Sequence, residues 1–248
     1  MIRSAFIALS LTVVTIFVGL PLLLYAMISG NANPLYRAGV AVTVWTCRVA
    51  GMRTRVEGLE NIPPGACLFA ANHTSNADGP AIVGAVRRRI AILAKKSLFA
   101  IPIVGPAFRI AHFVPVDRSN AERALAAIDE AVMHMKNGLS FLIYPEGTRS
   151  ADGRLRPFRH GAFVLAIKAG VPVVPVACSG AHRVLPKRSY RVRPGEVLVR
   201  FCPPIDPRDY SLDRRGELAE RVHDALAAAL PPDQQPASAP AAAISPQA

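Results

Sequence analysis

Two polar clusters in the sequence combine residue types that can do chemistry, and each follows a short apolar run. His73 and Asp78 lie five positions apart in the stretch NHTSNAD, directly after the apolar run 66–71. The stretch PEGTR, residues 145–149, directly follows the apolar run 141–144. Loops at the ends of buried strands are common positions for catalytic groups. A histidine beside a carboxylate offers an oriented base and PEGTR offers a cation for an anion, so the two clusters indicate a reaction on a phosphorylated substrate.

The spacing of His73 and Asp78 restricts the local structure in which they can meet. In a regular helix an offset of five residues gives about 140° of rotation, so the two side chains would not share a face. They meet only if His73 lies in a turn and Asp78 lies in or near the following helix. Asn72, Thr74 and Ser75 are typical turn and N-cap residues, which favours that arrangement. On spacing alone, an N-capping loop with a surface histidine is the competing interpretation.

The sequence near His73 offers no nucleophile. Ser75 lies two residues away, but the chain has no G-x-S-x-G stretch, and no cysteine pairs plausibly with the histidine. In the expected geometry Asp78 accepts a hydrogen bond from Nδ1 of His73, which leaves Nε2 as the base. We therefore interpret His73 as the base for a hydroxyl on a substrate, which corresponds to direct transfer between two bound substrates.

The PEGTR stretch has the composition of a phosphate-binding turn. Gly147 permits close backbone approach, Thr148 offers a hydroxyl and an amide, and Arg149 can hold a phosphate through two hydrogen bonds. Glu146 is expected to position Arg149 or a substrate hydroxyl. A tight turn with a surface arginine is the alternative. The stretch is not a P-loop, because the lysine and the second glycine are absent.

Strand-like and helix-like segments alternate from residue 55 to about 230. Strand candidates are 66–71, 90–94, 113–116, 140–144, 171–177 and 196–201. Helix candidates are 121–137, about 158–169 and about 214–230. Ser119 and Glu122 form a capping box before the first of these helices, and Gly138 follows it. The strand, helix, strand order within 140–177 predicts an α/β fold with a mixed, largely parallel sheet flanked by helices.

The amino-terminal segment has the length and composition of a membrane anchor. No charged residue occurs between Arg3 and Arg37, and residues 5–28 are almost continuously apolar. About 24 residues span roughly 36 Å, enough to cross a bilayer, whereas the core of a signal peptide has about 7–15 residues. We expect residues 1–54 to form a transmembrane or re-entrant helix plus an interfacial helix. Residues 55–230 then form the catalytic domain, and the Pro/Ala-rich residues 231–248 a disordered tail.

The composition favours an anionic membrane or anionic substrates. The net charge is +12, yet 51% of residues are hydrophobic. Nucleic acid is not expected as a partner, because only 6% of residues are aromatic and no nucleic-acid-binding motif is present. The four cysteines are scattered, without the spacing of a metal or redox site. Arginines 37, 48, 53 and 55 outnumber Arg3 across the apolar segment, which predicts an inner-membrane protein whose catalytic domain faces the cytoplasm.

Five stretches in the catalytic domain occur in an order that resembles the blocks of the glycerolipid acyltransferase family. The likeness is closest to the bacterial 1-acyl-sn-glycerol-3-phosphate acyltransferases and extends from about Arg55 to Gly180. The stretches are NHTSNAD (72–78), AKKSL (94–98), FVPVDR (113–118), YPEGTRS (144–150) and VPVVPV (171–176). The first of them contains the H-x₄-D pattern of His73 and Asp78.

The resemblance implies a role for each matched residue. His73 resembles the general base of the family and Asp78 its partner. Arg118 resembles a phosphate-contacting arginine, and Lys95 resembles a lysine that precedes that block. The residues that resemble the acceptor-binding block are Glu146, Gly147, Thr148 and Arg149.

The implied reaction moves a fatty acyl group from acyl-CoA or acyl-carrier protein to the sn-2 hydroxyl of 1-acyl-sn-glycerol 3-phosphate, giving phosphatidic acid. No metal or cofactor is expected, because the thioester is already activated. Two positions depart from the family pattern: His112 stands where glycine is usual, and Ser97 where an acidic residue is frequent. Both are expected near the acceptor, so another lyso-lipid is the alternative acceptor. Alternatives of other classes are a membrane-anchored esterase and a non-enzymatic membrane- or nucleic-acid-binding scaffold.

Overall fold

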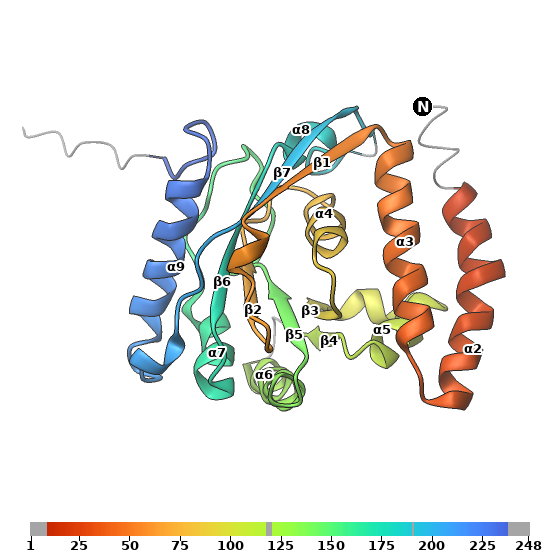
Figure 1. The fold of residues 1–248 in the computed structure, drawn as a ribbon, viewed down its shortest axis with the longest axis horizontal. Helices are drawn as coiled ribbons and strands as arrows, with labels where there is room; N and C mark the ends of the chain where they lie inside the picture. Colours follow the sequence, from red (N-terminus) through yellow and green to blue (C-terminus); the bar gives the residue numbers. More distant parts are fainter. Residues whose placement is uncertain (1–8, 118–120, 190, 238–248) are drawn as a thin grey trace, which may run out of the picture.

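The computed structural model describes residues 9–117, 121–189 and 191–237 of the 248-residue chain. These residues form one seven-stranded sheet in the order β1-β7-β6-β2-β5-β3-β4 (Figure 1). All neighbouring strands are parallel except β6 and β7, which are antiparallel. The strands are β1 Met52–Glu57, β2 Leu68–Ala71, β3 Ile90–Lys95, β4 Val114–Val116, β5 Ser140–Ile143, β6 Val173–Ser179 and β7 Gly195–Phe201. The predicted mixed, largely parallel sheet is confirmed.

Helices cover both faces of this sheet. The α-helices are α2 Leu20–Ser29, α3 Asn33–Val49, α4 Asp78–Ala85, α5 Val104–Ile110, α6 Ala121–Lys136, α7 Val164–Ala169, α8 Ala181–Val184 and α9 Arg215–Ala229. Short 3₁₀ turns lie at Leu59–Asn61, Lys96–Ala100, His160–Phe163 and Pro207–Asp209. In the central strand β2, Leu68 and Ala70 join the core under α6, α7 and α9, whereas Phe69 and Ala71 join the core under α4 and α8. This alternation follows from the two-residue period of a strand that is buried on both faces.

The six predicted strands are all present, but the sequence did not reveal β1. Its residues read MRTRVE, and Arg53 and Arg55 are exposed because β1 is an edge strand that pairs only with β7. The boundary expected at residue 55 therefore falls inside a strand of the sheet. The predicted helix at 158–169 is a 3₁₀ turn followed by the short α7. Gly138 has φ +90°, as expected for the residue that ends α6, whereas Ser119 lies outside the described residues.

The expected disordered tail is wrong for its first part. Gln234 is 1% exposed, its carbonyl accepts a hydrogen bond from the Leu155 amide at 2.8 Å, and its Oε1 accepts one from the Gly180 amide at 3.2 Å. The Pro/Ala-rich composition did not reveal that a single glutamine connects two loops of the domain. Residues 238–248 lie outside the described part of the chain.

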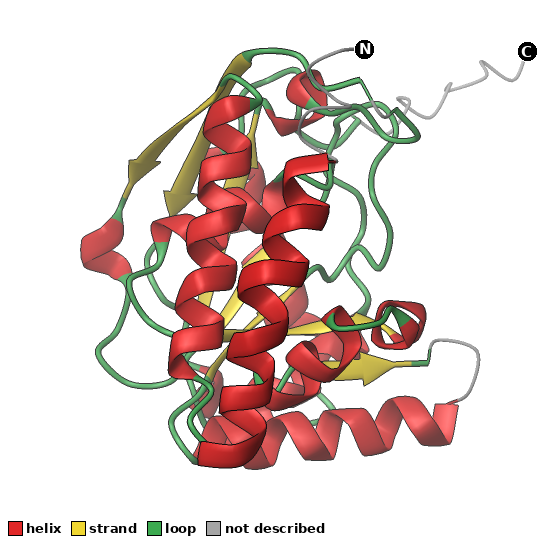
Figure 2. Cartoon of the chain, turned by 90° about the vertical axis from the view of Figure 1, so that its right-hand side faces the viewer, coloured by secondary structure: helices red, strands yellow, loops and turns green. Residues whose placement is uncertain are grey.

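The apolar amino-terminal segment forms one helix from Leu9 to Ser29, long and apolar enough to cross a membrane. A π-helical turn at Thr15–Gly19 lies just before Pro21, whose ring cannot follow a regular α-helical turn. After a left-handed Gly30 the chain reverses into α3, and α2 and α3 lie side by side (Figures 1 and 2). Only 11% of the most apolar part of the first helix is buried, so its outer face is exposed.

Candidate active site

The predicted site residues follow strands that are neighbours in the sheet. His73 comes two residues after β2, Glu146 three residues after the adjacent β5, and Lys95 ends β3, the next strand along. Because these strands are parallel, their carboxyl ends lie side by side along the same edge of the sheet, the one formed by the ends of the strands. The edge brings together two clusters that are about seventy residues apart in sequence. Arg118, which follows β4, lies outside the described residues.

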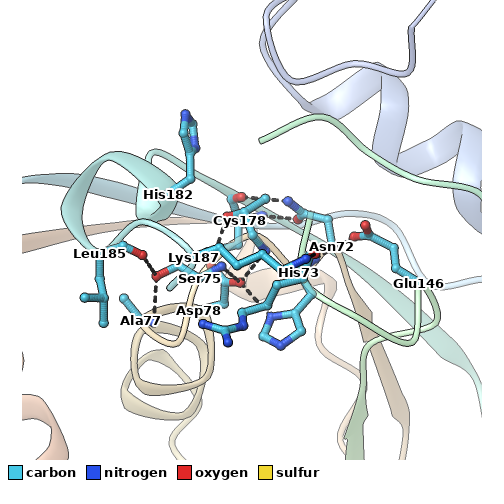
Figure 3. A network of polar contacts seen from close by, with 12 residues as sticks. Asn72, His73, Ser75, Ala77, Asp78, Glu146, Cys178, His182, Leu185 and Lys187 are labelled. Atoms are coloured by element: carbon cyan, nitrogen blue, oxygen red, sulfur yellow. Dashed lines mark hydrogen bonds and ion pairs between the residues drawn. The ribbon is translucent and has the colours of Figure 1, made fainter. Parts of the chain in front are cut away.

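His73 and Asp78 are in contact at this edge (Figure 3). Nδ1 of His73 lies 2.9 Å from Oδ2 of Asp78, which is the fully buried first residue of α4. The same carboxylate oxygen accepts hydrogen bonds from the amides of Thr74 and Ser75 at 2.7 and 2.8 Å. The predicted turn before a helix is thus confirmed, and the carboxylate both shapes the turn and orients the histidine. These donors stabilise a negative charge that would be costly if it were buried alone.

The other ring nitrogen of His73 is available to a substrate. The His73 side chain is 21% exposed, and its ring stacks on Tyr144 with centroids 3.9 Å apart. Nε2 makes no hydrogen bond to any residue that the structure describes. With Nδ1 held by Asp78 and the ring held flat on Tyr144, Nε2 has a fixed direction, as a general base requires.

Residues distant in sequence hold the His73 turn in place. The side chain of Asn72 pairs with the backbone of Cys178, accepting from its amide at 2.7 Å and donating to its carbonyl at 2.9 Å. The thiol of Cys178 lies 3.6 Å from Oδ1 of Asp78. Burial and the charge of Asp78 raise the pKa of Cys178 well above its ordinary value, so it stays a thiol and is no nucleophile. Sequence reasoning missed both contacts, because no spacing rule connects residues 72 and 178.

Ser75 is held as a structural residue. Its hydroxyl donates to the Leu185 carbonyl at 2.7 Å and accepts from the Ala77 amide at 3.0 Å. The residue is fully buried. A hydroxyl with both roles taken inside the protein does not serve as a nucleophile, which agrees with the sequence interpretation.

Glu146 contacts the His73 backbone, a partner that differs from both the Arg149 side chain and the substrate hydroxyl expected from the sequence. Its Oε1 accepts a hydrogen bond from the His73 amide at 2.6 Å, and the residue is 5% exposed. Burial raises the pKa of Glu146 to about 8, although the His73 amide acts in the opposite direction. Glu146 therefore connects the PEGTR turn to the His73 turn. The amide of Ser150 makes a second connection, donating to the His73 carbonyl at 2.7 Å.

We expect Glu146→Gln and Glu146→Ala to separate the acceptor role of this side chain from its charge. Glutamine keeps an acceptor for the His73 amide, whereas alanine leaves that donor unsatisfied and should cost about 1–3 kcal/mol of unfolding free energy. The comparison is made by urea unfolding at neutral pH. Equal destabilisation by both substitutions would contradict the acceptor role.

The raised pKa also predicts a pH dependence of stability. Between about 4.5 and 8 the folded protein keeps a proton on Glu146 that the unfolded chain releases. The stability contributed by the protonated carboxyl is fully present below about pH 4.5 and is lost as the pH rises through about 8. The unfolding free energy of the wild type should thus fall across this window relative to that of Glu146→Gln. Parallel pH profiles of the two proteins would show that the carboxyl is ionised throughout.

The PEGTR turn needs glycine at its centre. Gly147 has φ +74°, and a Cβ there would lie 2.7 Å from Nε of Arg159. Thr148 is exposed and Arg149 is half-buried, and the Arg149 carbonyl accepts a hydrogen bond from Nζ of Lys187 at 2.5 Å. Figure 3 shows Lys187 near the His73 turn. Lys187 comes from a loop without a recognisable motif, so sequence reasoning did not find it. The turn thus presents a hydroxyl and a guanidinium beside the His73 turn.

Lys95 and His112 lie at opposite ends of the β3–β4 pair. Lys95 is exposed at the carboxyl end of β3, beside Val116 of β4, which is the edge that carries His73. His112 precedes β4 and lies at the amino ends of the strands. His112 therefore lies at the other end of the strands from the His73 turn, and its expected place near the acceptor stays a prediction. Its φ of +62° explains why glycine suits this position.

Comparisons with known proteins show the family to which this chain is related. The family model described as Acyltransferase matches residues 53–179. The 1-acyl-sn-glycerol-3-phosphate acyltransferase of Limnanthes douglasii is 32% identical over 196 residues, which cover 79% of this chain and 68% of that protein. The Escherichia coli (strain K12) protein of the same name is 37% identical over 156 residues, which cover 62% of this chain and 63% of that one. The chain thus spans about two thirds of the length of these relatives.

A solved structure extends the match to the whole fold. The crystal structure of the 1-acyl-sn-glycerophosphate (LPA) acyltransferase PlsC from Thermotoga maritima has a TM-score of 0.75 and 30% sequence identity with this chain. The alignment covers 89% of this chain and 91% of that one. The resemblance predicted from the five sequence stretches is confirmed, and the chain belongs to the acyltransferase family.

Proposed function

We propose that this protein transfers a fatty acyl group from a thioester to the sn-2 hydroxyl of 1-acyl-sn-glycerol 3-phosphate, giving phosphatidic acid. The observation that carries the proposal is the His73–Asp78 pair, with Nδ1 bound to a buried carboxylate and Nε2 without a hydrogen-bond partner among the described residues. The names of the matched relatives supply the acceptor. The absence of a usable nucleophile at the described site favours direct transfer over an acyl-enzyme.

In the proposed reaction Nε2 of His73 accepts the hydroxyl proton as the acceptor oxygen attacks the thioester carbonyl. The new C–O bond forms a tetrahedral intermediate, and the C–S bond then breaks. The leaving thiolate takes the proton from the imidazolium, so the histidine returns to its starting state. Asp78 stabilises the imidazolium through the 2.9 Å contact. The reaction needs no metal or cofactor, because the thioester carbonyl is already activated.

The phosphate of the acceptor would be held by the cations at the same edge of the sheet. Arg149 and the Thr148 hydroxyl lie in the turn beside His73, and Lys95 ends a strand two places from β2. Neighbouring strands are about 4.8 Å apart, so Lys95 lies about 10 Å to the side of β2. The lysine side chain and a glycerol phosphate with its hydroxyl at His73 could together span that distance. Arg118 is proposed as a further phosphate ligand on the strength of the family resemblance.

The membrane contact is proposed to use the outer face of the helix Leu9–Ser29. Phe17, Met27 and Ile28 are 73%, 64% and 88% exposed, and no charged residue occurs on this helix. Because α2 packs lengthwise on α3, lipid would cover one side of it, as in an interfacial helix. The catalytic domain would face the cytoplasm, and the donor would be acyl-CoA or acyl-carrier protein. The net charge of +12 favours such anionic donors and an anionic leaflet.

The acceptor is tested by crossing acyl-CoA and acyl-carrier protein with a panel of lyso-lipids, using the purified full chain in detergent or vesicles. We expect turnover with 1-acyl-sn-glycerol 3-phosphate to exceed that with a lyso-aminolipid or a phosphodiester lysophospholipid. Faster turnover with the lyso-aminolipid or the lysophospholipid would show that this lipid, and not 1-acyl-sn-glycerol 3-phosphate, is the acceptor. Labelling by a fluorophosphonate probe would favour the esterase alternative, against which the engaged Ser75 hydroxyl already argues.

A further inference from the structure

An open cavity lies at the amino ends of β3 and β4, opposite the His73 site. It has a volume of about 630 Å³, opens to solvent, and is lined by the α2–α3 turn, by Arg89 just before β3, and by α5 and the residues that follow it. Arg89 and His112 precede β3 and β4, whereas Lys95 lies at the far end of β3. The cavity is therefore separate from the proposed reaction site. Figures 1 and 2 show α5 beside the lower ends of α2 and α3.

The titratable side chains that line this cavity are all basic. Arg89, Arg109 and His112 contribute to its walls, and none of its lining residues in the described chain is an aspartate or glutamate. The other polar groups are the amides of Asn31 and Asn33. A concave surface of this composition favours an anion.

Two of the three guanidinium nitrogens of Arg89 have no hydrogen-bond partner among the described residues. Its Nη1 donates to Oδ1 of Asn33 at 3.2 Å, and the guanidinium lies 5.6 Å from the centroid of the Tyr36 ring. Its Nε and Nη2 are buried without a hydrogen-bond partner among the described residues. Buried donors of a charged group are normally satisfied, because leaving them unpaired is costly. Because Nε and Nη2 are closed to solvent, an anion in the cavity would contact the guanidinium at its exposed Nη1, and the positive charge of the group is what favours it there.

A second cation, Arg109, and the His112 imidazole surround the same space. Burial and the neighbouring His134 lower the pKa of His112, so its ring is neutral at pH 7. Arg109 lies over the Phe99 ring at 5.8 Å and donates to the Phe99 carbonyl at 3.3 Å, which fixes its position. His112 is held in a left-handed conformation that L-residues rarely adopt, and its ring packs on His134 with centroids 4.5 Å apart. The cavity thus has three donors on separate elements, each with a defined position.

An exposed apolar surface begins at the cavity. Ala26, Met27 and Gly30 of α2 and its cap line the wall, and the neighbouring Leu24 and Ile28 are 51% and 88% exposed. A ligand with a phosphate and long hydrocarbon chains would satisfy both surfaces at once. We propose that this cavity binds the phosphate of an anionic glycerophospholipid whose acyl chains lie along the exposed face of α2. The site would fix the depth and rotation of the α2–α3 hairpin at the membrane surface.

The test measures binding of the full chain to sedimenting vesicles of phosphatidylcholine, with or without phosphatidylglycerol. Arg89→Gln/Arg109→Gln removes two cavity charges, and Arg215→Gln/Arg221→Gln removes two exposed charges from α9, at the other end of the sheet. We expect the cavity variant to bind anionic vesicles about tenfold or more weakly than the α9 variant. Both should bind neutral vesicles as the wild type does. Arg89→Lys/Arg109→Lys should recover most of the affinity, and Arg109→Gln alone gives a milder change if the double variant is unstable.

Three outcomes would overturn the proposal. An equal loss in the cavity and α9 variants would mean that only net charge matters. A loss on neutral vesicles would mean that the apolar helix is misplaced. Displacement of the protein from anionic vesicles by millimolar inorganic phosphate, but not by equal ionic strength of chloride, would identify a free phosphate as the ligand. Because His73→Ala leaves the cavity intact, it should bind vesicles normally, so failure here is distinguishable from failure of the proposed catalysis.

Discussion

Replacing His73 with alanine is expected to lower turnover by about 10²–10⁴-fold, the contribution of a positioned general base. The fold should survive, because the contacts of His73 with Glu146 and Ser150 use its backbone amide and carbonyl, which alanine keeps. The side chain itself is partly exposed. Turnover at saturating donor and acceptor, with the unfolding midpoint measured on the same sample, checks both parts of this expectation.

His160→Ala is the matched control for that experiment. His160 is an exposed histidine on the 3₁₀ turn before α7, and it makes no contact with the His73 turn among the described residues. Its removal should leave turnover within about twofold, as surface changes away from special features usually do. If His73→Ala were as active as His160→Ala, the base would have to be another group.

Asp78→Asn is expected to lower turnover by a comparable factor of about 10²–10⁴. One oxygen of Asp78 accepts from Nδ1 of His73 and from the amides of Thr74 and Ser75. An asparagine oxygen in that position keeps all three contacts, so the turn should hold its shape. The negative charge that stabilises the imidazolium is lost, and with it the effectiveness of the base.

Asp78→Ala provides the contrast to asparagine. It removes the acceptor from the buried Thr74 and Ser75 amides, so it should cost about 1–3 kcal/mol of unfolding free energy for each unsatisfied donor. Asparagine should thus lose activity with little loss of stability, and alanine should lose both. Activity of Asp78→Asn within a factor of three of the wild type would show that the charge has no catalytic role.

The local sequence pattern predicted the helices and strands with strong periodicity. It also predicted contacts between residues that lie close in sequence. The apolar runs before His73 and Pro145 are central strands, because burial on both faces demands an unbroken apolar run. The contact of His73 with Asp78 followed from helical geometry and from the turn-forming residues between them. Strand β1 was not predicted, because an exposed edge strand with the sequence MRTRVE has no unbroken apolar run.

Contacts that tertiary packing creates could not be predicted from the sequence. Glu146 lies 73 residues from its partner His73, and Cys178 lies 100 residues from Asp78. From the sequence we interpreted the Glu146 carboxyl as a substrate ligand. Only the fold shows that it faces the backbone of the His73 turn. The position of His112, at the opposite end of the strands from Lys95, likewise depends on the fold.

The position of the transferred acyl group tests the central claim most directly. The purified chain is incubated with 1-acyl-sn-glycerol 3-phosphate and a thioester that carries an isotopically labelled acyl group, and the product is digested with phospholipase A₂, which releases the sn-2 chain. We predict labelled phosphatidic acid whose label is released as free fatty acid, and no such product from His73→Ala. Label retained at another position, or product formed equally by the His73→Ala protein, would contradict transfer to the sn-2 hydroxyl by His73.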